Sequence, residues 1–145
     1  MTQYGMLPMV LWQLLVNESL YSLDTSSKDE GLYGIAGMST AGSNISNCEV
    51  DAVITGSNYV GGITSKTTGG ISKCIVKGDI FGLDYLGGIV GYSPVDASKV
   101  SDSVALLNSI TRIGGTGTNI HRICGFKYLG VLSNNKAIET MKFRY

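Results

Sequence analysis

The sequence predicts an all-β fold, a right-handed parallel β-solenoid of about four coils. Three observations favour it: a regular repeat along the chain, strands in which apolar residues alternate, and a composition rich in glycine and poor in charge. The 145 residues include 20 glycines and two prolines, and 15% of them are charged. This length suits one domain with a substantial core, and the glycine content indicates many tight turns.

Residues 1–30 are expected to flank or cap a repeat domain that spans residues 31–145. Residues 6–16, MLPMVLWQLLV, are apolar but much shorter than the roughly 20 residues that cross a bilayer. No basic stretch precedes them and no small-residue cleavage site follows, so they do not form a signal peptide. Leu11, Leu14 and Leu15 suit one face of a short amphipathic helix. We therefore expect a helical cap here, with no membrane insertion.

The repeat shows as columns of like residues at a spacing of 26. Tyr33, Tyr59 and Tyr85 keep this spacing. The same spacing joins five further pairs: Ile45 and Ile71, Cys48 and Cys74, Val50 and Val76, Ile54 and Ile80, and Gly56 and Gly82. A period of 20 to 50 residues indicates a solenoid, a propeller or an array.

The segments that carry these columns alternate with a period of two. Apolar or small residues occupy every second position at Cys48, Val50, Ala52 and Ile54, and again at Cys74, Val76, Gly78 and Ile80. Period two marks a strand with one buried face. A propeller blade needs about 40 residues, so a coil with two or three short strands, stacked at about 4.8 Å, fits better.

Two later units keep the pattern less strictly. Residues 100–110, VSDSVALLNSI, follow the frame of residues 71–80, with Ser103 in the place of Cys74 and extra residues, SPVDAS, in the preceding turn. Residues 119–138 begin with an apolar-glycine stretch and end in an Asn-rich turn, but they leave the 26-residue frame. Terminal coils are often atypical because one of them must cap the stack.

These units resemble the GLUG repeats of bacterial secreted and cell-surface proteins. The resemblance rests on YVGGITSKTTGGISKCIVKGDIFG, on YLGGIVGYSPVDASKVSDSVALL and on GLYGIAGMSTAGSNISNCEVDAVITG, and it covers residues 31 to 140. Lys73 and Asp102 stand where the family often has Asn. The resemblance implies a β-solenoid in a large surface protein, with a role in adhesion or display and without catalytic residues.

The cysteines are expected to be structural. Cys48 and Cys74 occupy equivalent places in successive coils, so their Cα atoms should lie within the range of a disulfide. Stacked parallel side chains do not aim their sulfurs at each other, so a ladder of free, buried thiols is favoured over a disulfide. Cys124 should be buried near the last turn. Without a CxxC pair, and with His121 as the single histidine, no zinc site or other metal site is expected.

Glycine pairs and tyrosines mark the same point of each coil. Gly61 with Gly62, and Gly87 with Gly88, are expected where the chain bends tightly or where coils approach too closely for a Cβ atom. A speculative binding column consists of Tyr33, Tyr59, Tyr85 and Tyr92. If the column faces solvent it could stack on sugars or on a protein, and if it points inward it is packing, which we favour.

No enzyme chemistry is evident, and no cofactor or catalytic residue is expected. Carboxylate sites need acids that converge on one face. Asp79, Asp84, Asp96 and Asp102 are the candidates, but Asp51 and Asp79 are expected near turns, with Lys73 and Lys77 alternating with them, and no second row of acids is evident. His121 lacks a nucleophile or an acidic orienter, and GGTGTN at 114–119 lacks the Lys of a phosphate loop. Eleven basic and eleven acidic residues give zero net charge, without the basic stripe of a nucleic-acid-binding protein.

The function expected from the sequence is a non-catalytic structural or adhesion module. It would belong to a bacterial surface or secreted protein, be extracellular, form a fragment of a larger chain, and present a solenoid surface to a glycan or a host protein next to neighbouring repeats. Two alternatives stay open, a carbohydrate-active β-helix enzyme and a phage-fibre-like trimerising segment.

Overall fold

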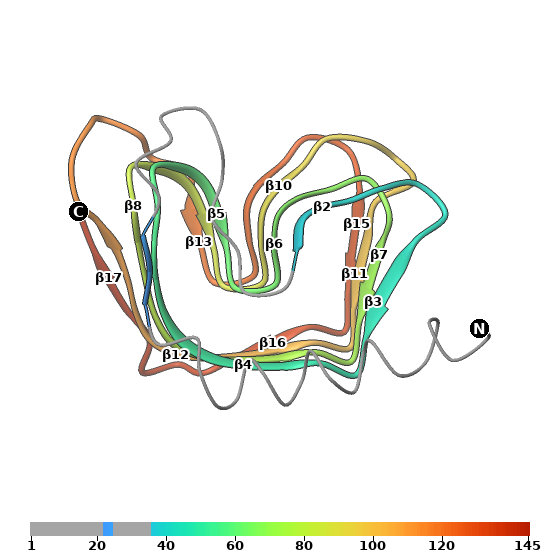
Figure 1. Cartoon of the computed structure of the whole chain (residues 1–145), viewed down its shortest axis with the longest axis horizontal. Coiled ribbons are helices and arrows are strands. Elements are labelled where there is room, and N and C mark those ends of the chain that lie inside the picture. The colour runs from blue at the N-terminus through green and yellow to red at the C-terminus, as the bar shows by residue number, and fades with distance from the viewer. Residues whose placement is uncertain (1–21, 25–35) are drawn as a thin grey trace.

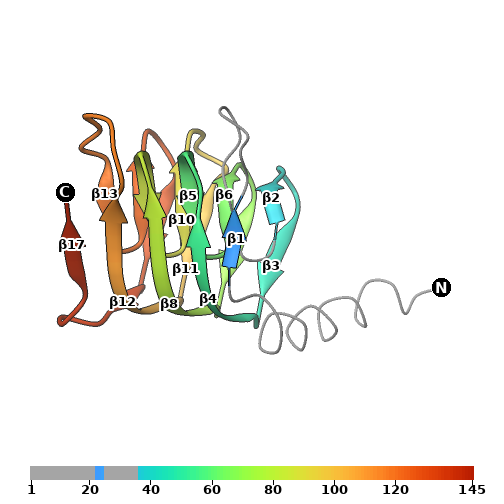
Figure 2. The same ribbon diagram turned by 60° about the vertical axis from the view of Figure 1, so that its left-hand side comes forward.

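A computed structural model describes residues 22–24 and 36–145. This part of the chain is all-β and contains no helix. Its strands pair in parallel throughout and wind into a solenoid of about four turns, which confirms the prediction of an all-β parallel solenoid. Figure 1 looks along the stack of coils, and Figure 2 shows the strands of successive coils side by side.

Four sheets run along the solenoid, and each complete coil contributes one strand to each of them. Sheet A contains β1 Ser22–Asp24, β4 Glu49–Thr55, β8 Ile75–Gly82, β12 Val104–Arg112, β16 Lys136–Ala137 and β17 Lys142–Arg144. Sheet B contains β5 Asn58–Gly61, β9 Asp84–Gly87 and β13 Ile120–His121. Sheet C contains β2 Ala36–Ser39, β6 Thr64–Thr67, β10 Val90–Ser93 and β14 Cys124–Lys127. Sheet D contains β3 Asn44–Ser46, β7 Gly70–Ser72, β11 Lys99–Ser101 and β15 Val131–Ser133.

Each complete coil therefore has four strands, not the two or three that we expected. The additional strands have three or four residues each, too few to show an alternating pattern in the sequence. The long strand of each coil, in sheet A, is the one that the alternation predicted. Its side chains at 48, 50, 52 and 54 are all buried, as are those at 74, 76 and 80.

The register between coils follows the predicted repeat and its predicted breaks. Val50 pairs with Val76, 26 positions later, and Val76 pairs with Ala105, 29 positions later. The step grows because the SPVDAS residues lengthen the turn between β10 and β11. The last coil differs further, since Val90 pairs with Cys124, 34 positions later.

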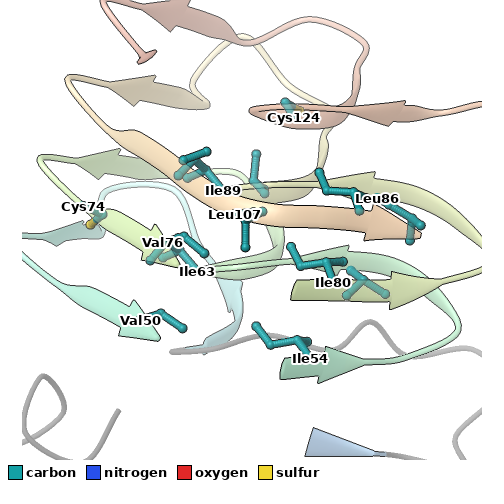
Figure 3. Packing of buried hydrophobic residues seen from close by; sticks show 14 of the residues in the cluster. Val50, Ile54, Ile63, Cys74, Val76, Ile80, Leu86, Ile89, Leu107 and Cys124 are labelled. Atoms are coloured by element: carbon teal, nitrogen blue, oxygen red, sulfur yellow. The ribbon is translucent and has the colours of Figure 1, made fainter. Parts of the chain in front are cut away.

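The core is a set of apolar columns that run through the stack. Val50, Val76, Ile80, Leu86 and Leu107 are among its fully buried members, and Figure 3 shows how side chains from facing strands pack together. Burying one such aliphatic side chain contributes about 1.5–3 kcal/mol. The stack is thus stabilised by contacts between neighbouring coils, as in other repeat proteins.

The path of the chain is indented between sheets B and C. In Figure 1, β5 and β13 run beside β6 and β10 through the middle of the cross-section, between the two outer walls. Strands of these two sheets also contact each other directly. The glycine pairs lie at the bottom of this indentation, where the chain turns from sheet B into sheet C.

The expected N-terminal helical cap is not found in the described residues. Residues 6–16, on which that prediction rested, lie outside them. The described part of the flank, Ser22–Asp24, is a strand that pairs with Val53–Thr55 of β4. In the described part of the chain, no helix is long and apolar enough to cross a membrane.

Candidate functional site

Four aromatic rings meet where sheets B and C run side by side. Tyr59 of β5 and Tyr85 of β9 stack, with ring centres 4.7 Å apart and planes 15° from parallel. Tyr92 of β10 lies 5.7 Å from Tyr59 and 5.9 Å from Tyr85. Phe126 of β14 lies 5.9 Å from both Tyr85 and Tyr92. We call these four residues the aromatic cluster.

The aromatic cluster is partly packed and partly in contact with solvent. Each of its four residues is half-buried, and the ammonium group of Lys66 lies 5.8 Å from the centre of the Tyr92 ring. Tyrosine suits such a position, because its ring can pack against other side chains while its hydroxyl group stays hydrated. Tyr59, Tyr85 and Tyr92 of the predicted column are thus brought together, whereas Tyr33 lies outside the described residues.

Sequence reasoning missed one member of this cluster, Phe126, and its neighbour Lys66. Both share a column with Tyr92, since Tyr92 pairs with Lys66 in β6 and with Phe126 in β14. Lys66 could have been found from the 26-residue spacing. Phe126 could not, because the step from Tyr92 to Phe126 is longer than the repeat.

The two stacked tyrosines hold an unusual backbone conformation. Tyr59 and Tyr85 have φ angles of 56° and 54°, in the left-handed region that side chains other than glycine disfavour. At Tyr85 the backbone N–H donates to the Asp84 carboxylate, 2.8 Å away. The same carboxylate accepts the backbone N–H of Asn119 in the next coil at 3.1 Å. These hydrogen bonds stabilise the backbone around Tyr85, and this backbone conformation directs the Tyr85 ring toward the aromatic cluster.

The glycine pairs allow the close approach that the sequence predicted. A Cβ atom on Gly61 would lie 2.7 Å from the backbone nitrogen of Gly91, which belongs to sheet C. A Cβ atom on Gly62 would lie 2.8 Å from a methyl group of Val76 across the core. Gly87 and Gly88 occupy the equivalent places one coil later, against Gly125 and Ala105. Sheets B and C therefore touch through bare backbone beneath the aromatic cluster.

The cysteines form a ladder at another corner of the coil, between sheets D and A. Cys48 and Cys74 are free and buried. The Cys48 thiol donates to the carbonyl of Ser46 at 3.2 Å, and the Cys74 thiol donates to that of Ser72 at 3.3 Å. In the third coil Ser103 does the same, donating to Ser101 at 2.9 Å. Each thiol thus stabilises the corner by a hydrogen bond to the backbone two residues earlier.

The electrostatics of the thiols agree with a structural role. The neighbouring Cys74 thiol lowers the pKa of Cys48, whereas Cys48 and burial together raise the pKa of Cys74. Burial also raises the pKa of Cys124 from its ordinary value of 9.0 to about 12. Cys74 and Cys124 are therefore neutral thiols at physiological pH, and neither is activated as a nucleophile. The predicted burial of Cys124 is confirmed, since it is 5% exposed.

The aspartates do not converge on one site in the described residues. Asp79 lies in β8, where its carboxylate accepts the Ser109 hydroxyl at 2.7 Å. Asp84 begins β9, Asp96 lies in the turn before β11, and Asp102 follows β11 and accepts from Asn134 at 2.6 Å. His121 is exposed in β13. Among the described residues, no three of the metal-binding types gather into a site.

Comparisons with protein-family models, with curated proteins and with solved structures find no match. The resemblance to GLUG repeats therefore stays a prediction from the sequence.

Proposed function

We propose that this chain is a non-catalytic adhesion or display module of a bacterial surface or secreted protein. The observation that carries the proposal is the aromatic cluster, in which four half-buried rings from two sheets contact one another. Partly exposed tyrosines are enriched where proteins bind partners, because they offer a large rigid surface at little cost in conformational entropy. Its partner would be a glycan or a protein of the host surface.

The surroundings of the cluster support binding rather than chemistry. Asp84, the nearest acid in sequence to Tyr85, already accepts two backbone N–H groups and the Asn119 side chain. With these hydrogen bonds, the Asp84 carboxylate stabilises the backbone around Tyr85 and Asn119. Lys66 adds a positive charge next to the Tyr92 ring, which favours ligands with acidic groups.

An array of glycans and matrix proteins tests the proposal. The wild-type chain is compared with Tyr92→Ala, which removes a ring that contacts the other three members of the cluster, and with Tyr128→Ala. Tyr128 is 65% exposed and lies outside the cluster, so it is the matched control. Thermal melts of each variant show that all are folded at the assay temperature.

We expect binding that Tyr92→Ala abolishes and Tyr128→Ala preserves. The absence of any ligand on the array, or equal binding by both variants, would contradict a role for the aromatic cluster. Cleavage of a polysaccharide that is lost in Asp79→Ala or Asp102→Ala would contradict the non-catalytic assignment and favour a carbohydrate-active enzyme.

A further inference from the structure

The core of the solenoid is open at its C-terminal end. In Figure 2, β17 and β13 lie at this end of the stack. A hollow of about 750 Å³ is found here, and all four sheets contribute apolar side chains to it. One from each sheet is Ile120 of β13, Cys124 of β14, Leu132 of β15 and Phe143 of β17. The hollow is therefore the place where the columns of the core end.

Leu132 shows most clearly what these columns lack. Ile71, Val100 and Leu132 share one column of sheet D. The first two are 1% and 0% exposed, because the next coil covers each of them, whereas Leu132 is 37% exposed. Among the described strands, β11 is the one partner of β15, so the other edge of β15 is unpaired. Uncovered apolar patches of this kind mark places where proteins interact.

The backbone of β15 offers hydrogen bonds at the same edge. The Val131 N–H donates to the Ser98 carbonyl at 2.8 Å, toward the preceding coil. The Ser133 carbonyl accepts the Asp102 N–H at 3.1 Å, also toward the preceding coil. The backbone groups of successive strand residues point to opposite sides, so the N–H and C=O of Leu132 face the unpaired edge. Leu132 thus presents a donor, an acceptor and an apolar side chain at the open end.

The open end is also basic. His121, Arg122 and Lys127 line the hollow, and no acid lines it. Residues 112–145, all of them described, contain six lysines and arginines and one acidic residue, Glu139. Among the described residues the salt bridge found joins two side chains of other coils, so these six cations are not neutralised by an ion pair. An acidic ligand is therefore attracted to this end.

We propose that an extended acidic segment of another protein binds here and adds a strand to β15. Its backbone pairs with Leu132, an apolar side chain enters the hollow between Leu132 and Phe143, and its acidic side chains lie near Arg122 and Lys127. Strand addition of this kind takes its affinity from the free sheet edge and its specificity from pockets for alternate side chains. The segment extends sheet D, so it leaves the pairing of β17 with β12 in sheet A intact. The proposal does not depend on the proposed function.

The open end suits a peptide better than an acidic glycan. Its unpaired N–H and C=O groups follow the spacing of a strand edge, which another strand matches. The side chains around them continue columns of buried aliphatic residues. A sugar ring carries hydroxyl groups around most of its rim, and burying these beside Ile120 and Leu132 leaves them without hydrogen-bond partners, which is costly.

Selection from a phage-displayed library of random peptides tests the proposal. The peptides have about ten random residues, long enough for one strand, and are selected against the wild-type chain at low salt. We expect the enriched peptides to be acidic, with apolar residues at alternate positions. Their binding should weaken as salt rises from about 0.05 to about 0.5 M, because salt screens the charges. A selection that enriches no peptide, or that enriches basic or purely polar peptides, would overturn the proposal.

Variants at the open end show where an enriched peptide binds. Phe126 lines the hollow but also belongs to the aromatic cluster, so the variants are made at residues outside that cluster. Leu132→Ser and Arg122→Glu should each weaken binding of the peptide by roughly tenfold or more in a calorimetric titration. Thermal melts show that each variant is folded at the temperature of the titration.

Two matched controls should bind the peptide as the wild type does. Leu106→Ser changes a leucine of the same 37% exposure on the outer face of β12. Lys66→Glu reverses one charge, as Arg122→Glu does, but beside the aromatic cluster. Binding that is lost in Lys66→Glu and kept in Leu132→Ser would place the peptide at the aromatic cluster and overturn the proposal.

N-methylation of the peptide tests the strand pairing itself. An enriched peptide is made in two forms, each methylated on every second backbone nitrogen, in opposite phases. Because alternate residues of a strand face the edge, one form should bind and the other should not. Equal behaviour of the two forms would contradict strand addition.

Heparin, an acidic glycan, tests the alternative ligand. We expect its binding to depend on charge alone, so that Arg122→Glu weakens it and Leu132→Ser does not. Heparin binding that Leu132→Ser abolishes, in the absence of any enriched peptide, would overturn the proposal in favour of a glycan.

Discussion

At the scale of single residues, each coil turns from sheet D into sheet A through one left-handed residue. The residues at this corner are Asn47, Lys73, Asp102 and Asn134, with φ angles between 50° and 55°. Asn and Asp tolerate this region better than other side chains. Lys73 is the exception in the column, and its backbone N–H still donates to Ser101 of the next coil at 3.2 Å.

Lys73→Asn should stabilise the chain. A left-handed conformation costs an ordinary residue roughly 1–2 kcal/mol, and Asn recovers part of that cost, so we expect a gain of about 0.5–1 kcal/mol in the free energy of unfolding. Urea denaturation measures it. Lys73→Val should instead destabilise the chain, because a β-branched residue is worst suited to this backbone. A Lys73→Val variant as stable as Lys73→Asn would refute the explanation.

Cys124 should make stability fall at alkaline pH. Its pKa is raised from 9.0 to about 12, so the unfolded chain releases the thiol proton at a lower pH than the folded chain does. The resulting stabilisation is complete below about pH 9 and is lost as pH rises toward 12.

The check on Cys124 is the free energy of unfolding from pH 7 to 11 for the wild type and for Cys124→Ala. Other groups titrate equally in both, so the difference isolates the thiol. The wild-type curve should fall more steeply above pH 9, and parallel curves would show that this thiol is not buried as described.

At the scale of elements, sheets B and C approach each other closely because glycines, which have no side chain, lie where the two sheets meet. The sequence predicted that the glycine pairs mark tight bends or close approaches, and the structure confirms it. It did not predict that the contact would indent the coil and gather the aromatic cluster. Strands of three or four residues leave no periodic signal, and the left-handed φ angles of Tyr59 and Tyr85 cannot be read from an alternating pattern.

Gly61→Ala should destabilise the fold by about 3 kcal/mol, because its Cβ atom would lie 2.7 Å from the Gly91 nitrogen and would force the sheets apart. Gly114→Ala is the control, since the nearest atom to its Cβ is a flexible Leu83 methyl group at 3.3 Å. The control should change stability by less than about 0.5 kcal/mol. Equal effects of the two substitutions in thermal or urea unfolding would argue against the contact between sheets B and C.

At the scale of the whole molecule, most of the architecture could be predicted from one repeat. The 26-residue columns predicted the parallel stacking, the buried faces of β4 and β8, the place of Ser103 and the lengthened turn before β11. The last coil was predicted to drift, but its register was not, because the longer step to β14 leaves no matching column. For this reason Phe126 was missed.

The register between coils is the central claim, and interstrand NOEs in an NMR spectrum test it most directly. The fold predicts contacts that link Val50 with Val76, and Val76 with Ala105, in a parallel arrangement. Contacts that instead join consecutive strands, such as β8 and β9, as an antiparallel hairpin would contradict the solenoid.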